Sequence, residues 1–309
     1  MITTPSKDQL RDKSFLLEYF RHRAEQTRHI RNRNSVENPD KKRIDEIVKA
    51  LKESRESIIQ QVGLKAQSEN WSRFEIIDSV LMITYASYVV MIDYRNEFWP
   101  YDYMAFSRRI GELWEPFCAL AWKHPVKSGI SFTIPPKFKD VKQILTKEIR
   151  DSIVALKISN EEKDKIIGQN ERVWSLVTSG EIKLELDLHF TDGKTKYNID
   201  FKSGFGSNEK GNTNRLLLVA SIYDMIDENQ KCEIYVRATE ESNNRYLQKL
   251  KNSQLWSVYC GVEGYERMEE HTGFEMKKWI NRNISWENDF DRKTISHLLN
   301  NNLGAYLKW

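Results

Sequence analysis

Two aspartates and a lysine near the middle of the chain have the types and spacing for phosphate chemistry. Asp200 and Lys202 are two positions apart in KYNIDFK, and Asp187 precedes Asp200 by 13 positions. Side chains two apart on a strand project from one face, with Cα atoms about 6.5 Å apart. Carboxylates are hard ligands for Mg²⁺, and a neighbouring ammonium group can orient water or stabilise negative charge. These residues are therefore candidates for metal-dependent phosphodiester hydrolysis.

Two adjacent strands would have to place these side chains together. In EIKLELDLHF, residues 181–190, apolar and polar residues alternate, which predicts a strand with Asp187 on its polar face. The following TDGK, residues 191–194, predicts a hairpin turn. The returning strand carries Asp200 and Lys202 on one face, so the hairpin should bring them close to Asp187.

Two further polar residues share the predicted face of Asp187. Glu185 competes with Asp187 as the first metal ligand, and both alternatives stay open. His189 is interpreted as a surface histidine rather than a general base, because no partner for proton transfer is placed beside it.

A glycine-rich polar loop, SGFGSNEKGNTNR, follows the second strand. Gly204, Gly206 and Gly211 would let the backbone approach a ligand or take positive φ, although a plain flexible connection explains the loop equally well. The order GxxxxGK[ST] is absent, which disfavours a nucleotide hydrolase. Candidate contacts to DNA phosphates or base edges are Ser207, Asn208, Lys210, Asn212, Asn214, Arg215, Arg237, Asn243, Asn244 and Arg245.

The most basic short stretch lies elsewhere, in RHRAEQTRHIRNRN, with five arginines and one acidic residue between Arg21 and Arg33. Arginines placed near phosphates would give salt-sensitive affinity. A solvated helix face is an equally good reading.

Secondary-structure signals divide the chain of 309 residues into two parts. Up to about residue 178 the apolar spacing is helical, whereas strands and helices are mixed after it. We expect an α+β (mixed α/β) protein with a helical N-terminal region, residues 1–105, for DNA embrace or dimerisation. A catalytic domain, residues 106–309, would follow, with a helical insertion at about 125–178.

The hairpin residues resemble the D…(D/E)xK signature of the PD-(D/E)xK nucleases, with Leu186 in place of the proline of the nominal Pro-Asp pair. This resemblance implies a restriction-endonuclease-like core, a central mixed β-sheet flanked by helices. It also implies that Asp187 and Asp200 bind metal while Lys202 contacts the attacking water. IGELWEPF resembles the upstream helix that carries a further glutamate in this family, so Glu115 is a third candidate metal ligand and catalytic residue.

Within that superfamily, IDFKSGFGSNEKGN, the large helical portion and the chain length are similar to type II restriction endonucleases. The resemblance implies sequence-specific, Mg²⁺-dependent cleavage of double-stranded DNA, with Mn²⁺ as a substitute, leaving 5′-phosphate and 3′-hydroxyl ends. It also implies a homodimer. The alternatives are a structure-specific or repair nuclease of the same superfamily and a non-catalytic DNA-binding module.

Composition is that of a soluble protein, with a formal net charge of +3 that neither demands nor excludes a polyanionic partner. Three widely spaced cysteines favour a reducing cytoplasm over a disulfide framework. The charged start, MITTPSKDQLRDK, lacks the apolar stretch of a signal peptide. The longest apolar run, residues 79–92, falls short of the roughly 20 residues that cross a bilayer, so we expect no membrane partner.

Overall fold

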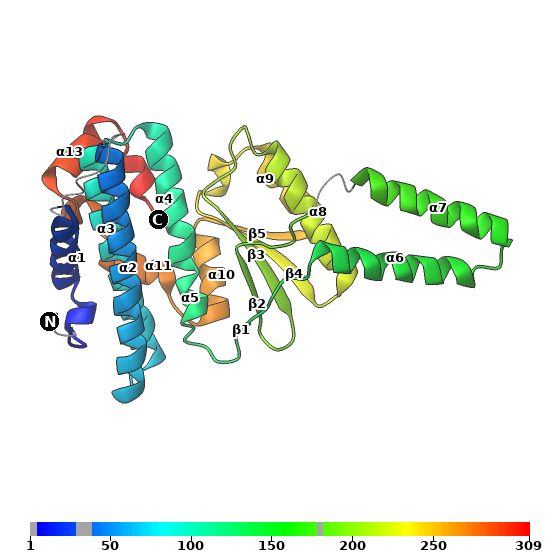
Figure 1. Ribbon diagram of the computed structural model, residues 1–309, viewed down its shortest axis with the longest axis horizontal. Coiled ribbons are helices and arrows are strands. Elements are labelled where there is room, and N and C mark those ends of the chain that lie inside the picture. Colours follow the sequence, from blue (N-terminus) through cyan, green and yellow to red (C-terminus); the bar gives the residue numbers. More distant parts are fainter. Residues whose placement is uncertain (1–4, 29–38, 178–181) are drawn as a thin grey trace. The chain divides into compact units, whose positions relative to one another are not determined.

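The chain forms two compact units in the computed structural model, which describes residues 5–28, 39–177 and 182–309 (Figure 1). The first unit joins Met1–Ser128 to Val262–Trp309, and the second is Gly129–Gly261. The first is helical and the second contains the sheet, so the predicted α+β class is confirmed. The division does not coincide with the expected boundary after residue 105, because the last part of the chain returns to the helical unit.

Helix α3 (Arg73–Phe98) forms the centre of the helical unit, where it packs against α1 (Lys13–Arg28) and α2 (Pro39–Ser68). It begins with a capping box, in which the side chains of Ser72 and Glu75 each bind the other's backbone N–H. Among the described helices, α3 alone is long and apolar enough to cross a membrane, but 83% of its apolar window is buried. That burial is typical of a core helix.

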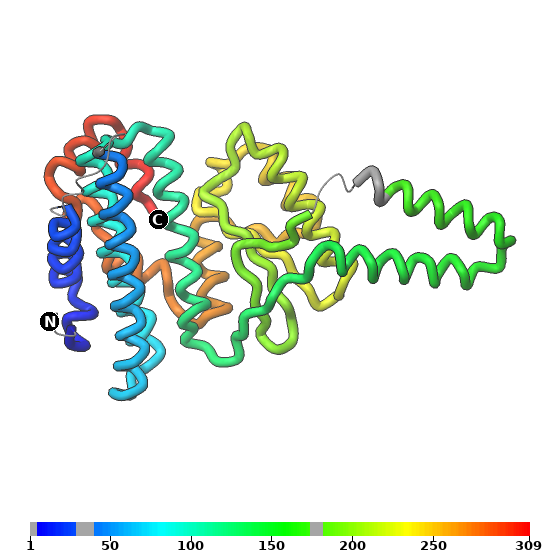
Figure 2. Tube along the Cα trace, viewed as in Figure 1, coloured from blue at the N-terminus to red at the C-terminus, as the bar shows by residue number. Residues whose placement is uncertain are grey.

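The C-terminal helices join this unit through hydrogen bonds to the N-terminal ones. Trp114 on α4 (Tyr103–Cys118) donates to the Tyr265 hydroxyl on α10 (Val262–Thr272) at 2.7 Å, and Tyr85 on α3 donates to Asp289 (2.6 Å). Figure 2 shows the orange and red C-terminal trace among the blue and cyan helices. The further elements of the unit are α4 (Tyr103–Cys118), α5 (Leu120–Lys123), α10 (Val262–Thr272), α11 (Met276–Asn283), α12 (Trp286–Asp289), α13 (Arg292–Asn300), and the 3-10 turns η1 (Gln9–Arg11) and η3 (Gly304–Leu307).

The second unit contains a five-stranded mixed sheet in the order β1-β2-β3-β4-β5 among the described residues. The first three strands pair antiparallel, and β3, β4 and β5 pair parallel. Helices α8 and α9 make the two crossovers that parallel pairing requires. The elements are β1 (Ser131–Phe132), α6 (Phe138–Ala155), α7 (Asn160–Val177), β2 (Leu188–Thr191), β3 (Lys196–Lys202), α8 (Lys210–Ile226), β4 (Gln230–Val236), η2 (Glu240–Ser242), α9 (Arg245–Asn252) and β5 (Trp256–Cys260).

One face of the sheet packs on α8, α9 and the first turns of α6. The shared core combines Ile234 and Val236 of β4 with Leu216 of α8, Leu247 of α9 and Val141 of α6. The hairpin turn contains Gly193 at φ +92°, the left-handed backbone that its Asp-Gly sequence predicts. This core fixes the end of β3, where the candidate residues lie.

Candidate active site

The hairpin brings Asp187 opposite Asp200. Leu188 of β2 pairs with Ile199 of β3, and extending this antiparallel register by one residue places Asp187 across from Asp200. The Asp187 carboxylate accepts a hydrogen bond from the backbone N–H of Phe201 at 2.7 Å. The Asp187 side chain thus takes the place of a strand-to-strand hydrogen bond at Phe201, between Asp200 and Lys202. This bond fixes the Asp187 carboxylate beside them.

The predicted first strand is wrong in its first half, since β2 covers only Leu188–Thr191 and the chain bends at Asp187. Leu184 and Leu186 are nevertheless buried and alternate with exposed neighbours. The backbone there is satisfied by side chains: Leu186 N–H donates to His189 Nε2 (2.9 Å), and Leu184 C=O accepts from Tyr223 (2.9 Å). The alternating pattern therefore predicted the burial of Leu184 and Leu186 correctly, although these residues are not part of a strand.

Asp200 is the most enclosed of the candidate residues, with 1% of its surface exposed. Its Oδ2 atom forms a 2.7 Å ion pair with Lys202, and Arg215 of α8 lies 3.7 Å from Oδ1. Burial raises the pKa of Asp200 to about 6, assisted by the nearby charge of Asp187 and opposed by Lys202. The sequence marked Arg215 only as a possible DNA contact. Its place in the second turn of the helix after β3 explains its position near the strand end.

The two candidates for the first carboxylate have different neighbours in the structure. Asp187 raises the pKa of Asp200, whereas Glu185, also exposed, opposes the lowering of the pKa of His189 that burial causes. Asp187 is thus the carboxylate electrostatically linked to Asp200. The surface interpretation of His189 is wrong: the residue is 6% exposed, and its Nδ1 lies 2.8 Å from Asn198 Oδ1. It is a satisfied core histidine that holds the bend before β2.

The glycine-rich loop is fastened at its start. Phe205 is buried, its N–H donates to Asn243 Oδ1 (2.6 Å), and Asn244 donates to the Gly206 carbonyl. A Cβ on Gly204 would lie 3.4 Å from both Ala238 Cβ and Asn243 Oδ1, which is an ordinary van der Waals contact. Positive φ is not its function, because the glycines with positive φ in the described chain all lie elsewhere.

The structure gives the other proposed DNA contacts different surroundings. Asn212 donates to Glu209 (2.9 Å), and the Arg245 guanidinium lies over the Tyr246 ring at 5.5 Å. The half-buried Arg237 donates its backbone N–H to Lys202 C=O at 2.8 Å. Those with exposed side chains are Ser207, Asn208, Lys210, Asn214 and Arg245.

Glu115 lies on α4 and is half-buried in the helical unit, whereas the hairpin residues belong to the sheet unit. The structure therefore leaves its predicted role untested.

The basic stretch from residue 21 to residue 33 is described only as far as Arg28. Within α1, Arg21 donates to Asp289 C=O, Arg23 to Ser54 and Arg28 to Glu97. These described arginines fasten α1 to the rest of its unit, and the remainder lies outside the described residues.

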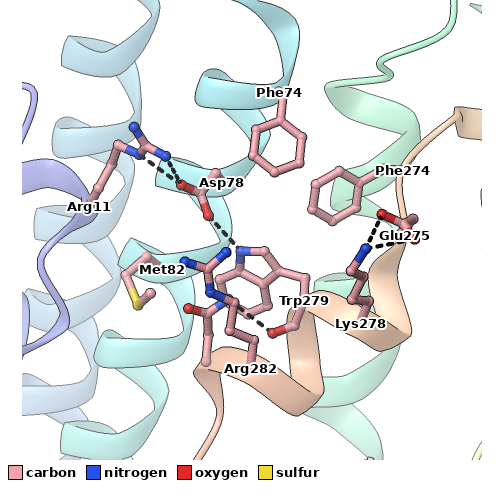
Figure 3. Close-up of a pocket in the computed structure, with 10 residues that line it drawn as sticks. Arg11, Phe74, Asp78, Met82, Phe274, Glu275, Lys278, Trp279 and Arg282 are labelled. Atoms are coloured by element: carbon pink, nitrogen blue, oxygen red, sulfur yellow. Dashed lines mark hydrogen bonds and ion pairs between the residues drawn. The ribbon is translucent and has the colours of Figure 1, made fainter.

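A separate pocket of about 340 Å³ lies in the helical unit (Figure 3). Its central carboxylate, Asp78, accepts hydrogen bonds from Arg11 (2.7 Å) and Trp279 (2.7 Å). Lys278 at its rim pairs with Glu275 (3.1 Å). These four charged groups, Arg11, Asp78, Glu275 and Lys278, therefore bind one another within the pocket.

The described residues contain no group of three or more histidine, cysteine, aspartate or glutamate side chains that could hold a metal ion. Mg²⁺ commonly uses one or two carboxylates and completes its shell with waters and substrate phosphate. Asp187 and Asp200 meet that requirement, and the buried Oδ2 of Asp200 has an ion pair but no aligned hydrogen-bond donor in the part of the chain described. No protein-family model, curated protein or solved structure matches this chain.

Proposed function

We propose that this protein is a Mg²⁺-dependent endodeoxyribonuclease with a restriction-endonuclease-like core. The observation that carries the proposal is a cluster at the end of β3, where the buried Asp200 pairs with Lys202 and Asp187 accepts a hydrogen bond from the adjacent Phe201 N–H. Sheet topology supports it, since three antiparallel strands are followed by a helix that crosses to a parallel strand. Fold alone does not define an activity, so the residue geometry must carry the chemical argument.

Asp187 and Asp200 would hold the metal ion, which supplies Lewis-acid activation of water and neutralises charge at the scissile phosphate. Asp200 is enclosed by Lys202 and Arg215, whose side chains are 21% and 38% exposed. Rotation of these long, partly exposed side chains would open the carboxylate to the ion and to DNA. The hydrogen bond from Phe201 N–H holds Asp187 at the site meanwhile.

Lys202 would orient the attacking water and stabilise negative charge that develops at phosphorus. Its ammonium group already lies 2.7 Å from Asp200, so a short movement would transfer it from the carboxylate to the phosphate. Hydrolysis by in-line attack would leave 5′-phosphate and 3′-hydroxyl ends. The hairpin resembles that of type II restriction endonucleases. On this basis the proposal extends to sequence-specific cutting by a homodimer.

The direct test is digestion of a fully sequenced plasmid with Mg²⁺, followed by sequencing of the product ends. We expect discrete cuts, with Asp200→Asn and Lys202→Met slowing cleavage by at least about 100-fold, the scale of losing one group that stabilises transition-state charge. Asp200→Asn preserves the shape of a buried carboxylate and removes its charge, so folding should be retained.

Glu185→Gln is the matched control, because it removes a nearby exposed carboxylate whose charge acts on His189. It should cleave at the wild-type rate. Uniform degradation would contradict sequence specificity, and faster cutting of branched DNA would indicate a structure-specific nuclease. Failure of the folded protein to cut any DNA with Mg²⁺ or Mn²⁺ would overturn the enzymatic proposal.

A further inference from the structure

Helix α6 presents a row of cations outside the candidate active site. Lys139, Lys142, Lys147 and Arg150, together called the basic stripe, line one groove with Gln143 and Thr146. The groove has a volume of about 460 Å³. At a rise of about 1.5 Å per residue, the cations span about 16 Å along the helix.

The burial pattern of α6 leaves the basic stripe facing solvent. Phe138, Val141 and Leu145 anchor the first turns in the core, and Ile153 is the other buried residue of the helix. Lys139, Lys147 and Arg150 are exposed. The anchored apolar face thus holds α6 in place while the cations remain available to a partner.

The exposed cations of the basic stripe, Lys139, Lys147 and Arg150, have few ion-pair partners within the described chain, although the same helix also carries the exposed acids Asp140, Glu148 and Asp151. Arg150 pairs with Glu171 of α7 at 4.0 Å, with both side chains about 60% exposed. Such an exposed pair contributes little and can exchange its partner. Lys139 and Lys147 form no recorded ion pair within the described ranges.

The chemistry of the groove selects one class of partner. Its lining contains four cations and two neutral polar residues, with neither an acidic nor an aromatic residue among those described. A row of lysines provides flexible point charges that suit successive phosphates. Without aromatic rings it provides no platform for stacking unpaired bases, which single-strand binders use.

We propose that the basic stripe binds the phosphate backbone of duplex DNA. It would supply sequence-independent affinity beyond the hairpin site, holding duplex that is not being cut. Binding through the stripe requires no catalysis, so this inference can be tested separately from the nuclease proposal.

The test is fluorescence anisotropy with labelled duplex DNA in EDTA, where cleavage is prevented, over a series of salt concentrations. Lys139→Gln/Lys147→Gln should weaken binding roughly tenfold or more and reduce the slope of log affinity against log salt by about 1.8, or about 0.9 for each lost phosphate contact. Both lysines are exposed, so the variant should retain its fold, as circular dichroism would verify.

The charge-matched control is Lys194→Gln/Lys231→Gln. Lys194 lies in the β2–β3 turn and Lys231 near the start of β4, both exposed and at the end of these strands opposite Lys202. It should keep the wild-type salt slope.

An unchanged slope in Lys139→Gln/Lys147→Gln, an equal loss in the control, or absence of duplex binding by the wild type would overturn the stripe proposal. Stronger competition by anionic vesicles than by duplex DNA, at equal phosphate, would also overturn it. Loss of binding in the stripe variant of a protein that cuts no DNA would support the stripe while rejecting the nuclease.

Discussion

At the scale of residues, the central feature is a carboxylate that the fold keeps away from water. Asp200 is almost completely buried at the end of β3, and Lys202 is its closest cation. Desolvation outweighs this ion pair, which is why the pKa of Asp200 rises to about 6 rather than falling. An elevated carboxylate pKa beside a specific charge partner is common at functional sites, and structural ion pairs also produce it.

This pKa predicts the pH dependence of cleavage. Asp200 is protonated below about pH 6, and a protonated carboxyl is a poor metal ligand, so activity at subsaturating Mg²⁺ should fall about tenfold per pH unit below that value. Because metal and proton compete for the same oxygens, raising the Mg²⁺ concentration should move the inflection to lower pH. Plasmid-cleavage rates across pH at two Mg²⁺ concentrations measure this shift. An inflection whose pH does not change with the Mg²⁺ concentration would contradict metal binding by Asp200.

At the scale of elements, the end of β3 is held by the segment that follows β4. Asn243 accepts from Phe205 N–H and donates to Thr239 C=O (2.7 Å), so one side chain joins the loop after β3 to the connection before α9. Asn244 caps α9 by accepting from Tyr246 N–H at 2.9 Å. Both asparagines therefore have structural roles at the edge where Lys202 emerges.

Asn243→Ala should accordingly destabilise the fold rather than remove a DNA contact. Leaving Phe205 N–H without its acceptor should lower the free energy of unfolding by about 1–3 kcal/mol. Ser207→Ala, in the exposed part of the same loop, is the control and should change stability by less than about 0.5 kcal/mol. Urea unfolding measures both variants. Unchanged stability with weakened DNA binding would instead support the DNA-contact role that the sequence suggested for Asn243.

At the scale of the whole molecule, the helical unit is completed by chain that follows the sheet unit. A buried carboxylate marks this closure: Asp93 of α3 is 3% exposed, and its Oδ1 accepts from Asp291 N–H at 3.1 Å. Arg21 is 3.7 Å from its other oxygen. Burial, with the nearby charge of Asp291, raises the pKa of Asp93 to about 7.

The raised pKa makes the stability of the helical unit depend on pH. Folding favours protonated Asp93, so its contribution is complete below about pH 4, the ordinary pKa range, and is lost as pH rises through about 7. Between about pH 5 and 8, the wild type should lose about 3 kcal/mol more unfolding free energy than Asp93→Asn. Urea unfolding followed by tryptophan fluorescence suits this comparison, since seven of the nine tryptophans lie in the helical unit. Parallel pH profiles for the two proteins would refute it.

The sequence alone determined the local elements and the grouping of candidate residues. Periodicity indicated the helical character of the chain up to about residue 178 and the alternating burial around Leu184 and Leu186, and the Asp-Gly turn set the register that places Asp187 opposite Asp200. These features depend on neighbours within a few residues or on one tight turn, so they can be read from spacing.

Tertiary structure alone decided which polar groups are buried and what they bind. It turned His189 into a core residue, began β2 only at Leu188, used Asn243 to hold the loop, and returned the C-terminal helices to the N-terminal unit. Each outcome depends on partners far along the chain, such as Asp93 with Asp291. Burial and hydrogen-bond satisfaction are properties of the packed molecule, and a single sequence does not reveal which distant groups will meet.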